Sequence, residues 1–195
     1  MKLEYVYIPD AIGDRDAYEA AEKKLSKTGA LSGELRRLSA KNNEKSKRES
    51  LAGLCLLASM QDLSGVFIER DEKGRPFAFG GDFDFNVSHT DDLAVCAISS
   101  ARVGVDTEKI RALPDRDRFI TRYFSKNEID YIEGSNDKDE AFFRVWTRKE
   151  ALLKLSGDGL TKDLRTLDTA DARYAFTEKT VTFGKERYII TAIEG

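Results

Sequence analysis

Alternation and helical spacing of apolar residues predict a first half in which strands flank a group of helices. The run Leu3–Ile8 alternates and is rich in β-forming residues, and Pro9 is expected to end it. In a later stretch Leu51, Leu54 and Ala58 recur at helical spacing. The predicted elements are a strand at Leu3–Ile8, helices at Asp14–Lys27, around Leu35–Leu38 and at Lys45–Met60, and strands at Val66–Glu69, Phe83–Ser88 and Leu93–Ser99.

The second half repeats this plan. Ser125 and Glu128 have the spacing of a capping box, which predicts a helix that stops near Gly134. The strongest helical pattern precedes Gly157, a residue suited to a helix end. The predicted elements are a strand at Val103–Glu108, helices at Asp115–Thr121, Ser125–Gly134 and Asp137–Ser156, and strands at Arg173–Thr177, Thr180–Phe183 and Tyr188–Ile193.

The two halves therefore predict an α+β fold built by internal duplication. In each half strands surround one long helix, and the segment Arg48–Leu51 is placed in its helix as Lys149–Leu152 is in the other. Short strands with tight connections favour antiparallel sheets. We expect two similar halves, residues 1–102 and 103–195, related by a pseudo-twofold axis, with an active site in the cleft between them.

Composition narrows the class of protein. The chain has 195 residues, 34% of them charged, and a net charge of -3 with basic and acidic residues interspersed, so it lacks the basic stripe of a general nucleic-acid binder. No signal peptide is recognised at the N-terminus, and the apolar run Leu51–Met60 is too short to span a membrane. Cys55 and Cys96 fall in apolar patterns and are expected to be buried thiols. These features favour a cytoplasmic protein that binds neither membrane nor nucleic acid.

Two carboxylates that lie two residues apart are candidate metal ligands. Val103 and Val105 indicate a buried strand, and Asp106 and Glu108 then project from one side of it. Adjacent anions repel each other. A hard divalent cation, Mg²⁺ or Mn²⁺, that is shared with a phosphate would relieve that repulsion. Taken by itself, the motif is explained better by two solvated carboxylates at a strand end, and the later motifs reverse that preference.

The long helix of the second half offers a third carboxylate. Glu150 lies one turn from Lys154, with Lys149 beside it. A solvated Glu–Lys pair is the simpler interpretation, but a carboxylate at the core edge would complete an oxygen-rich metal site with Asp106 and Glu108.

The single histidine limits the other candidate chemistries. Ser88 and His89 are neighbours in a strand and so face opposite sides, which argues against a hydrolase pair. One histidine also excludes the usual zinc sites. His89 either caps its strand or holds an anion at the strand end.

Several separate motifs then occur in an order that resembles the 4′-phosphopantetheinyl transferases, in the two-halved branch typified by the surfactin-synthetase activator. The resemblance runs from about Gly74 to Leu160. The motifs that carry it are Gly74-Arg75-Pro76, Phe85-Asn86-Val87-Ser88-His89, Val103-Gly104-Val105-Asp106-Thr107-Glu108, Phe124-Ser125-Lys126-Asn127-Glu128, Trp146-Thr147-Arg148-Lys149-Glu150-Ala151 with Lys154, and Gly157-Asp158-Gly159-Leu160.

The resemblance implies an enzyme that moves the phosphopantetheine arm of coenzyme A to a serine of an apo acyl or peptidyl carrier protein and releases adenosine 3′,5′-bisphosphate. It implies Mg²⁺ as cofactor, coenzyme A as substrate and a monomer. The implied metal ligands are Asp106, Glu108 and Glu150. The implied catalytic residues are Glu150 as base and Lys154 on the leaving phosphate, and the implied coenzyme A contacts are Arg48, Arg75, Pro76, Ser88, His89 and Lys149.

Some positions depart from the family pattern, and two other classes of function stay open. Arg75 stands where the family usually has lysine, and Thr90-Asp91-Asp92 replaces a serine-glycine turn. The N-terminal basic residues do not align cleanly, and Arg36 and Arg37 are candidates among them. The alternatives are a metal-dependent nucleotide phosphohydrolase and a non-catalytic coenzyme A-binding module.

Overall fold

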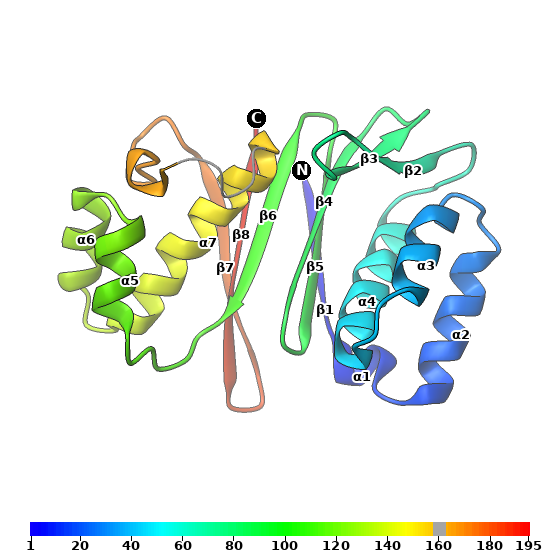
Figure 1. Ribbon diagram of the computed structural model, residues 1–195, viewed down its shortest axis with the longest axis horizontal. Helices are drawn as coiled ribbons and strands as arrows, with labels where there is room; N and C mark the ends of the chain where they lie inside the picture. The colour runs from blue at the N-terminus through cyan, green and yellow to red at the C-terminus, as the bar shows by residue number, and fades with distance from the viewer. Residues whose placement is uncertain (158–162) are drawn as a thin grey trace.

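The computed structural model describes residues 1–157 and 163–195. Figure 1 shows two groups of helices on the outside of the molecule, with the larger sheets between them. The order from one side to the other is helices, sheet, sheet and helices. This arrangement is mixed α+β, as predicted from the sequence.

The first half contains one three-stranded sheet, a small hairpin sheet and four helices. The long helix α4 lies against β5, β4 and β1. The elements are β1 (Lys2–Tyr7), α1 (Ile8–Ile12), α2 (Arg15–Ser26), α3 (Ser32–Ser39), α4 (Glu44–Met60), β2 (Phe67–Arg70), β3 (Pro76–Phe79), β4 (Asp84–Thr90) and β5 (Leu93–Ser99).

The described part of the second half contains one three-stranded sheet and three α-helices. Its long helix, α7, packs on β6 and β8. The elements are β6 (Val103–Lys109), α5 (Arg116–Tyr123), α6 (Lys126–Glu133), α7 (Lys138–Ser156), the short 3-10 helix η2 (Leu164–Thr166), β7 (Phe176–Phe183) and β8 (Glu186–Glu194).

Both larger sheets are antiparallel and have the same strand order. In the first half the order is β1-β5-β4, and in the second it is β6-β8-β7. In each sheet the first strand of the half pairs with the last strand, which also pairs with the strand before it. The internal duplication predicts this order, and the pseudo-twofold axis itself stays a prediction.

The sheets of the two halves meet through a shared apolar core. Leu93, Val95 and Ala97 of β5 are fully buried against residues of β6, β7 and β8. Tyr7 of β1 stacks on Phe183 of β7, with ring centroids 4.7 Å apart. Burying large apolar side chains is the main stabilising term in folding, so this core holds the two halves together.

A row of polar side chains joins the halves at the edge of this core. β4 and β6 lie side by side without pairing as strands, and alternate residues of β4 reach across to β6. Asp84 Oδ2 accepts the Val103 N–H (2.8 Å), and Asn86 Oδ1 accepts the Val105 N–H (3.0 Å). Backbone donors of β6 that have no strand partner are thereby satisfied.

The observed elements differ from the predicted ones where a residue type was given too much weight. Pro9 lies in the first turn of α1, which begins at Ile8, rather than only ending a strand, because proline suits the first helical turn. The helix predicted around Leu35–Leu38 begins earlier, at Ser32, and includes Gly33. The strand β3 begins at Pro76, where no strand was predicted. The strands predicted at Arg173–Thr177 and Thr180–Phe183 are one strand, β7.

The helix ends agree with the sequence patterns. Ser125 and Glu128 form the predicted capping box of α6, and Gly157 ends α7 with φ 75°. Cys55 and Cys96 are free thiols. Within the described residues, none of the helices has the length and apolar character needed to cross a membrane.

Candidate active site

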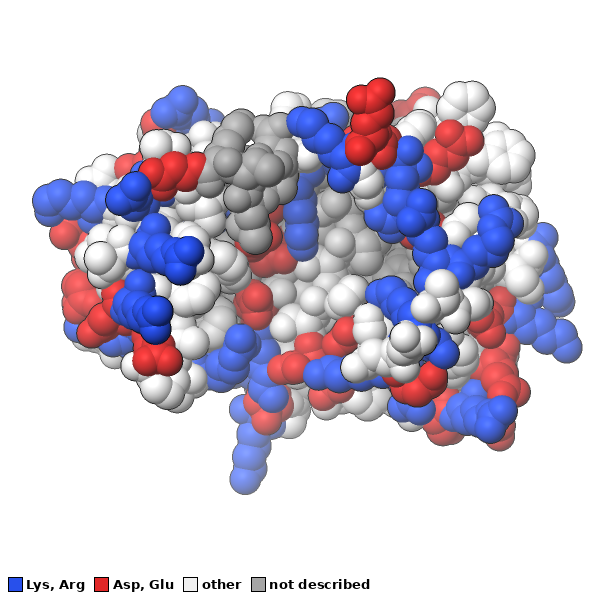
Figure 2. All heavy atoms as spheres, viewed as in Figure 1, with Lys and Arg blue, Asp and Glu red and all other residues white. Residues whose placement is uncertain are grey.

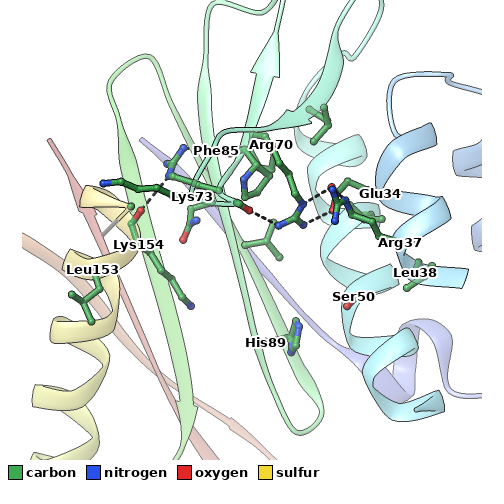
Figure 3. A pocket seen from close by; sticks show the side chains of 18 of the residues that line it. Glu34, Arg37, Leu38, Ser50, Arg70, Lys73, Phe85, His89, Leu153 and Lys154 are labelled. Atoms are coloured by element: carbon green, nitrogen blue, oxygen red, sulfur yellow. Dashed lines mark hydrogen bonds and ion pairs between the residues drawn. The ribbon is translucent and has the colours of Figure 1, made fainter. Parts of the chain in front are cut away.

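A cavity of about 450 Å³ opens between the two halves of the molecule. Figure 3 shows α3 and the β2–β3 hairpin on one side of it and α7 on the other. His89 lies at the far end of β4, away from Lys73 and Phe85. Side chains from both halves therefore face one space, as predicted for the cleft. The lining includes Arg37, Lys41, Arg70, Lys73, Arg75, Pro76, Phe85, Asn86, His89, Glu150, Leu153 and Lys154.

The carboxylates of β6 continue the row of contacts between β4 and β6. Ser88 Oγ donates to Asp106 Oδ1 (2.8 Å), and Thr90 Oγ1 donates to Glu108 Oε2 (3.4 Å). Asp106 is buried and Glu108 is half-buried. Residues at alternate positions of a strand share a face, so both carboxylates project toward β4, as their spacing predicted.

The helix α7 brings Glu150 and Lys154 to the same place. Gly104 of β6 permits the close approach, because a Cβ on this residue would lie 2.0 Å from the carbonyl oxygen of Ala151. Lys154 Nζ donates to Asp106 Oδ1 (2.6 Å) and to Ser88 Oγ (2.7 Å). One ammonium group thus binds the carboxylate of β6 and the hydroxyl of β4 at the cavity wall.

Burial and neighbouring charge act on two of the three carboxylates, Glu108 and Glu150. Burial, together with the charge of Asp106, raises the pKa of Glu150 to about 7, and Lys154 opposes this rise. Burial and the charge of Asp106 also raise the pKa of Glu108. A carboxylate whose pKa is raised by a neighbouring carboxylate would be stabilised in its charged form by positive charge nearby.

Among the described residues, no group of three or more potential ligands stands close enough to form a ready-made metal centre. The chemistry of the three side chains nevertheless fits a hard divalent cation. Asp106 Oδ2 is buried without a hydrogen-bond partner, and burial, followed by the negative charge of Asp106, raises the pKa values of Glu108 and Glu150. Carboxylate oxygens are the ligands that Mg²⁺ prefers, and a cation here would satisfy the unpaired oxygen.

His89 lines the cavity at the end of β4. Its Nδ1 lies 3.4 Å from Glu49 Oε2 on α4. Burial, with the nearby Lys41 and Lys154, lowers the pKa of His89 to about 4, so the imidazole is neutral at pH 7 in this structure. A phosphate placed here would favour the protonated imidazole, because an adjacent negative charge raises the pKa of histidine.

A group of basic residues borders the cavity on the side of the first half. They are Arg37 of α3, Lys41 after that helix, Arg70 of β2 and Lys73 of the following turn. Figure 2 shows Lys and Arg side chains gathered around the hollow on this side, and acidic side chains toward the second half. The sequence named only Arg37 of this group as a candidate. The nearby basic positions Arg36, Arg37 and Lys41 were the available signal.

Glu34 of α3 organises part of this basic group. Its carboxylate accepts two hydrogen bonds from Arg70, at 2.8 and 2.6 Å, and lies 3.8 Å from Arg37. The fixed pair leaves Arg70 with its guanidinium at the cavity wall. A bidentate carboxylate–guanidinium pair has restricted geometry, so this side chain is oriented before any ligand arrives.

Two predicted coenzyme A contacts are not brought to the cavity. Arg48 donates to the carbonyl oxygen of Gly13 (2.8 Å) and borders a different hollow, near α1. Lys149 is fully buried, where its ammonium group contacts Glu128 (2.7 Å) and the carbonyl oxygen of Leu164 (2.7 Å). Both contacts were expected only from the family resemblance, and the helical pattern around each residue does not reveal which neighbour its face meets.

Arg75 and Pro76 line the cavity where the hairpin meets α7. Ser88 lies behind the lining, where its hydroxyl accepts a hydrogen bond from the lining residue Lys154 (2.7 Å). The predicted loop residues Asp158, Gly159 and Leu160 lie outside the described part of the chain. The sequence-predicted residues brought together are thus Asp106, Glu108, Glu150, Lys154, Ser88, His89, Arg75 and Pro76.

Comparisons with known proteins agree with the motif pattern. Residues 102–192 match the family model of the 4′-phosphopantetheinyl transferase superfamily. The chain is 37% identical over 105 residues to the 4′-phosphopantetheinyl transferase HetI of Nostoc sp., covering 50% of this chain and 44% of that protein. It is 35% identical over 99 residues to gsp of Aneurinibacillus migulanus, covering 49% of this chain and 40% of that protein.

A third relative, the 4′-phosphopantetheinyl transferase Sfp of Bacillus subtilis, is 34% identical over 107 residues, which cover 53% of this chain and 46% of that protein. The matches thus span less than half the length of these curated relatives. Within this chain, β6 and α7, which carry the three carboxylates and Lys154, fall inside the matched residues. Residues 102–192, somewhat less than half of the chain, are thus similar to the 4′-phosphopantetheinyl transferase superfamily.

Proposed function

We propose that this protein transfers the 4′-phosphopantetheine group of coenzyme A to a serine of an apo carrier protein and releases adenosine 3′,5′-bisphosphate. The observation that carries the proposal is the meeting of Asp106, Glu108 and Glu150 with Lys154 beside a basic cavity. The chemistry needs a nucleophile to be positioned and negative charge on phosphate to be stabilised, and this site offers groups for both.

The basic border of the cavity suits the nucleotide part of coenzyme A. Arg37, Lys41, Arg70 and Lys73 supply positive charge around a space of about 450 Å³. We assign the 3′-phosphate to the end of the cavity where His89 lies. We assign the adenine to the part of the lining that Pro76 provides. A pocket with several fixed cations binds a polyanion more strongly than a neutral analogue.

Glu150 and Lys154 are the proposed catalytic residues. Because its pKa is raised to about 7, Glu150 is suited to accept a proton from the incoming serine near neutral pH. Lys154 lies one helical turn away and contacts Asp106, so a small side-chain movement would allow it to donate to a leaving phosphate oxygen instead.

Mg²⁺, or Mn²⁺ in its place, is the proposed cofactor. Asp106, Glu108 and Glu150 would hold it, and it would supply charge stabilisation to the pyrophosphate. The free carboxyl oxygen of Asp106 supports this assignment. A titration of the protein with Mg²⁺ followed by thermal unfolding tests it separately from activity, because a cation that binds only the folded state raises the melting temperature.

We propose that the protein works as a monomer in the cytoplasm. One chain supplies both walls of the cavity, so no second copy is needed to complete the site. Two free thiols favour a reducing compartment. Analytical ultracentrifugation tests the monomer, and an obligate oligomer without monomer activity would contradict it.

Mass spectrometry of candidate apo carrier proteins tests the function. Each carrier is incubated with the protein, coenzyme A and Mg²⁺, and the carrier is expected to gain the mass of phosphopantetheine. Adenosine 3′,5′-bisphosphate should appear in equal amount. Release of this nucleotide without a carrier would instead indicate a phosphohydrolase, and coenzyme A binding with neither product would indicate a non-catalytic module.

A further inference from the structure

The guanidinium of Arg75 has a hydrogen-bond acceptor for every one of its donors within the protein. Nε donates to the carbonyl oxygen of Lys154 (3.2 Å), and Nη2 donates to that of Val103 (2.9 Å). The two oxygens of Asp84 accept from Nη1 (2.8 Å) and Nη2 (2.6 Å), and Nη1 also contacts the carbonyl oxygen of Pro76 (3.3 Å). An arginine has five N–H donors, and these five contacts account for all of them.

These contacts tie together four parts of the molecule. Arg75 precedes β3, Asp84 begins β4, Val103 begins β6 and Lys154 lies in the last turn of α7. Asp84 Oδ2 also accepts the Val103 N–H (2.8 Å), so the carboxylate contacts both halves. The Arg75 side chain is only 8% exposed, and screening of the ion pair by solvent is therefore weak.

The carbonyl groups at the end of α7 depend on this cluster and on one other arginine. Arg75 donates a hydrogen bond to the carbonyl oxygen of Lys154, and Arg102 donates to the carbonyl oxygens of Leu155 and Ser156. The last carbonyls of a helix have no partners in the helix, and cations are favoured at this end. Arg75 differs from Arg102 in that it also joins the helix end to the carboxylate on β4.

We propose that Arg75, paired with Asp84, is a positioning residue that fixes the end of α7 against β4 and β6 and thereby sets Lys154 beside Asp106. This inference rests on the proposed transferase function and assigns Arg75 a role other than hydrogen bonding to the nucleotide. Since its five donors are in use, Arg75 can bind a ligand only by giving up contacts within the protein. A lysine keeps the charge but has three donors and no planar fork, so it cannot replace these contacts.

The test compares Arg75→Lys, Asp84→Asn and the double variant with the wild type. We expect kcat for carrier modification to fall at least tenfold in each single variant, because a displacement of about 1 Å in a reacting group costs on the order of a hundredfold. The affinity for coenzyme A, measured by calorimetry, should change less than threefold. The double variant should lose little more than either single variant, since the two residues act as one unit.

Arg102→Lys is the matched control, because it alters the same helix end without touching Asp84. It should keep kcat within about twofold of the wild type. Loss of coenzyme A affinity in Arg75→Lys with kcat retained would overturn the inference and make Arg75 a ligand contact. An equal loss of kcat in Arg102→Lys would also overturn it, because any weakening of the helix end would then suffice.

Hydrogen exchange separates this inference from the proposed function. The Val103 amide is protected by Asp84, and the Gly157 amide is protected by the carbonyl oxygen of Leu153. In Arg75→Lys both amides should exchange at least tenfold faster than in the wild type. In Arg102→Lys the exchange rate of the Val103 amide should equal that of the wild type. If the wild type transfers no phosphopantetheine, and the two amides still lose protection in Arg75→Lys, the transferase proposal is wrong and the positioning role stands. If the wild type is active and the Arg75→Lys amides exchange normally, the positioning role falls.

Discussion

At the scale of single residues, His89 gives the sharpest distinction between binding a ligand and stabilising a strand. If the imidazole contacts the 3′-phosphate, His89→Ala should lower the affinity for coenzyme A about tenfold or more. This is the effect of losing a charge-assisted hydrogen bond of about 1.5–3 kcal/mol. Binding of 3′-dephospho-coenzyme A, which lacks this phosphate, should change little. Calorimetry with both ligands checks this, and equal losses for the two would show that His89 does not bind that group.

The lowered pKa of His89 predicts a dependence of stability on acid. The imidazole has a pKa of about 4 in the folded protein, compared with about 6.5 when unfolded. Between these values the unfolded chain binds a proton that the folded protein does not, so the free energy of unfolding should fall as the pH drops from about 6.5 to 4. Above pH 6.5 this contribution is constant.

Urea unfolding of the wild type and His89→Asn across pH 4–7 measures this effect. The carboxylates of the protein titrate in both, so the difference between the two slopes isolates the histidine. The variant should lose stability less steeply with acid. Parallel slopes would mean that His89 is not held neutral by its surroundings.

The sequence identified candidate residues more readily than it predicted the surroundings of each one. Asp106, Glu108 and Glu150 were found from spacing alone as candidates, because strand alternation fixes a shared face and helix patterning marks the core edge. Lys149 was misjudged for a physical reason. Its partner Glu128 is far away in sequence, and nothing local indicates that a lysine will be fully buried in an ion pair.

At the scale of elements, the packing of β6 on α7 decides whether the site forms. Gly104→Ala would place a methyl group 2.0 Å from the Ala151 carbonyl and 2.7 Å from the Leu155 backbone nitrogen, so the helix must move. We expect a loss of about 1–3 kcal/mol in the free energy of unfolding, the usual cost of overpacking, together with a large loss of transfer. Denaturant unfolding and the carrier assay measure the two effects.

Gly33→Ala is the control for this substitution. Gly33 lies in α3, and the nearest atom to an added Cβ would be 3.7 Å away, an ordinary contact. Alanine is also the better helix former, so stability should stay equal or rise. If Gly104→Ala behaved like Gly33→Ala, the close approach of β6 and α7 would not be needed for the site.

Elements with strong local signals were predictable, and those set by distant contacts were not. The helix α7 was recognised by its apolar spacing and by Gly157, and α6 by its capping box. By contrast, β3 is four residues long, starts with proline and owes its conformation to pairing with β2. A short strand that depends on its partner leaves little pattern in its own sequence.

At the scale of the whole molecule, the shared core predicts that the two halves fold as one unit. The side chains of Leu93, Val95 and Tyr188 are fully buried where the sheets meet, and separating the halves would expose them to water. Residues 103–195 expressed alone should therefore be unfolded or aggregated, and the full chain should unfold in one transition. Circular dichroism and calorimetry check this. A stable isolated half would show that residues 1–102 and 103–195 are independent domains.

The central claim is that the three carboxylates and Lys154 form a metal-dependent site for phosphopantetheine transfer. Substitution of Asp106 tests this claim most directly, because Asp106 contacts Lys154 and its charge raises the pKa of both other carboxylates. With a carrier that the wild type modifies, we expect Asp106→Ala to lower the rate on the order of a thousandfold or more in mass spectrometry, equivalent to about 4 kcal/mol of transition-state stabilisation. The variant should stay folded and lose the rise in melting temperature that Mg²⁺ gives the wild type. Full transfer by folded Asp106→Ala in Mg²⁺ would contradict the account.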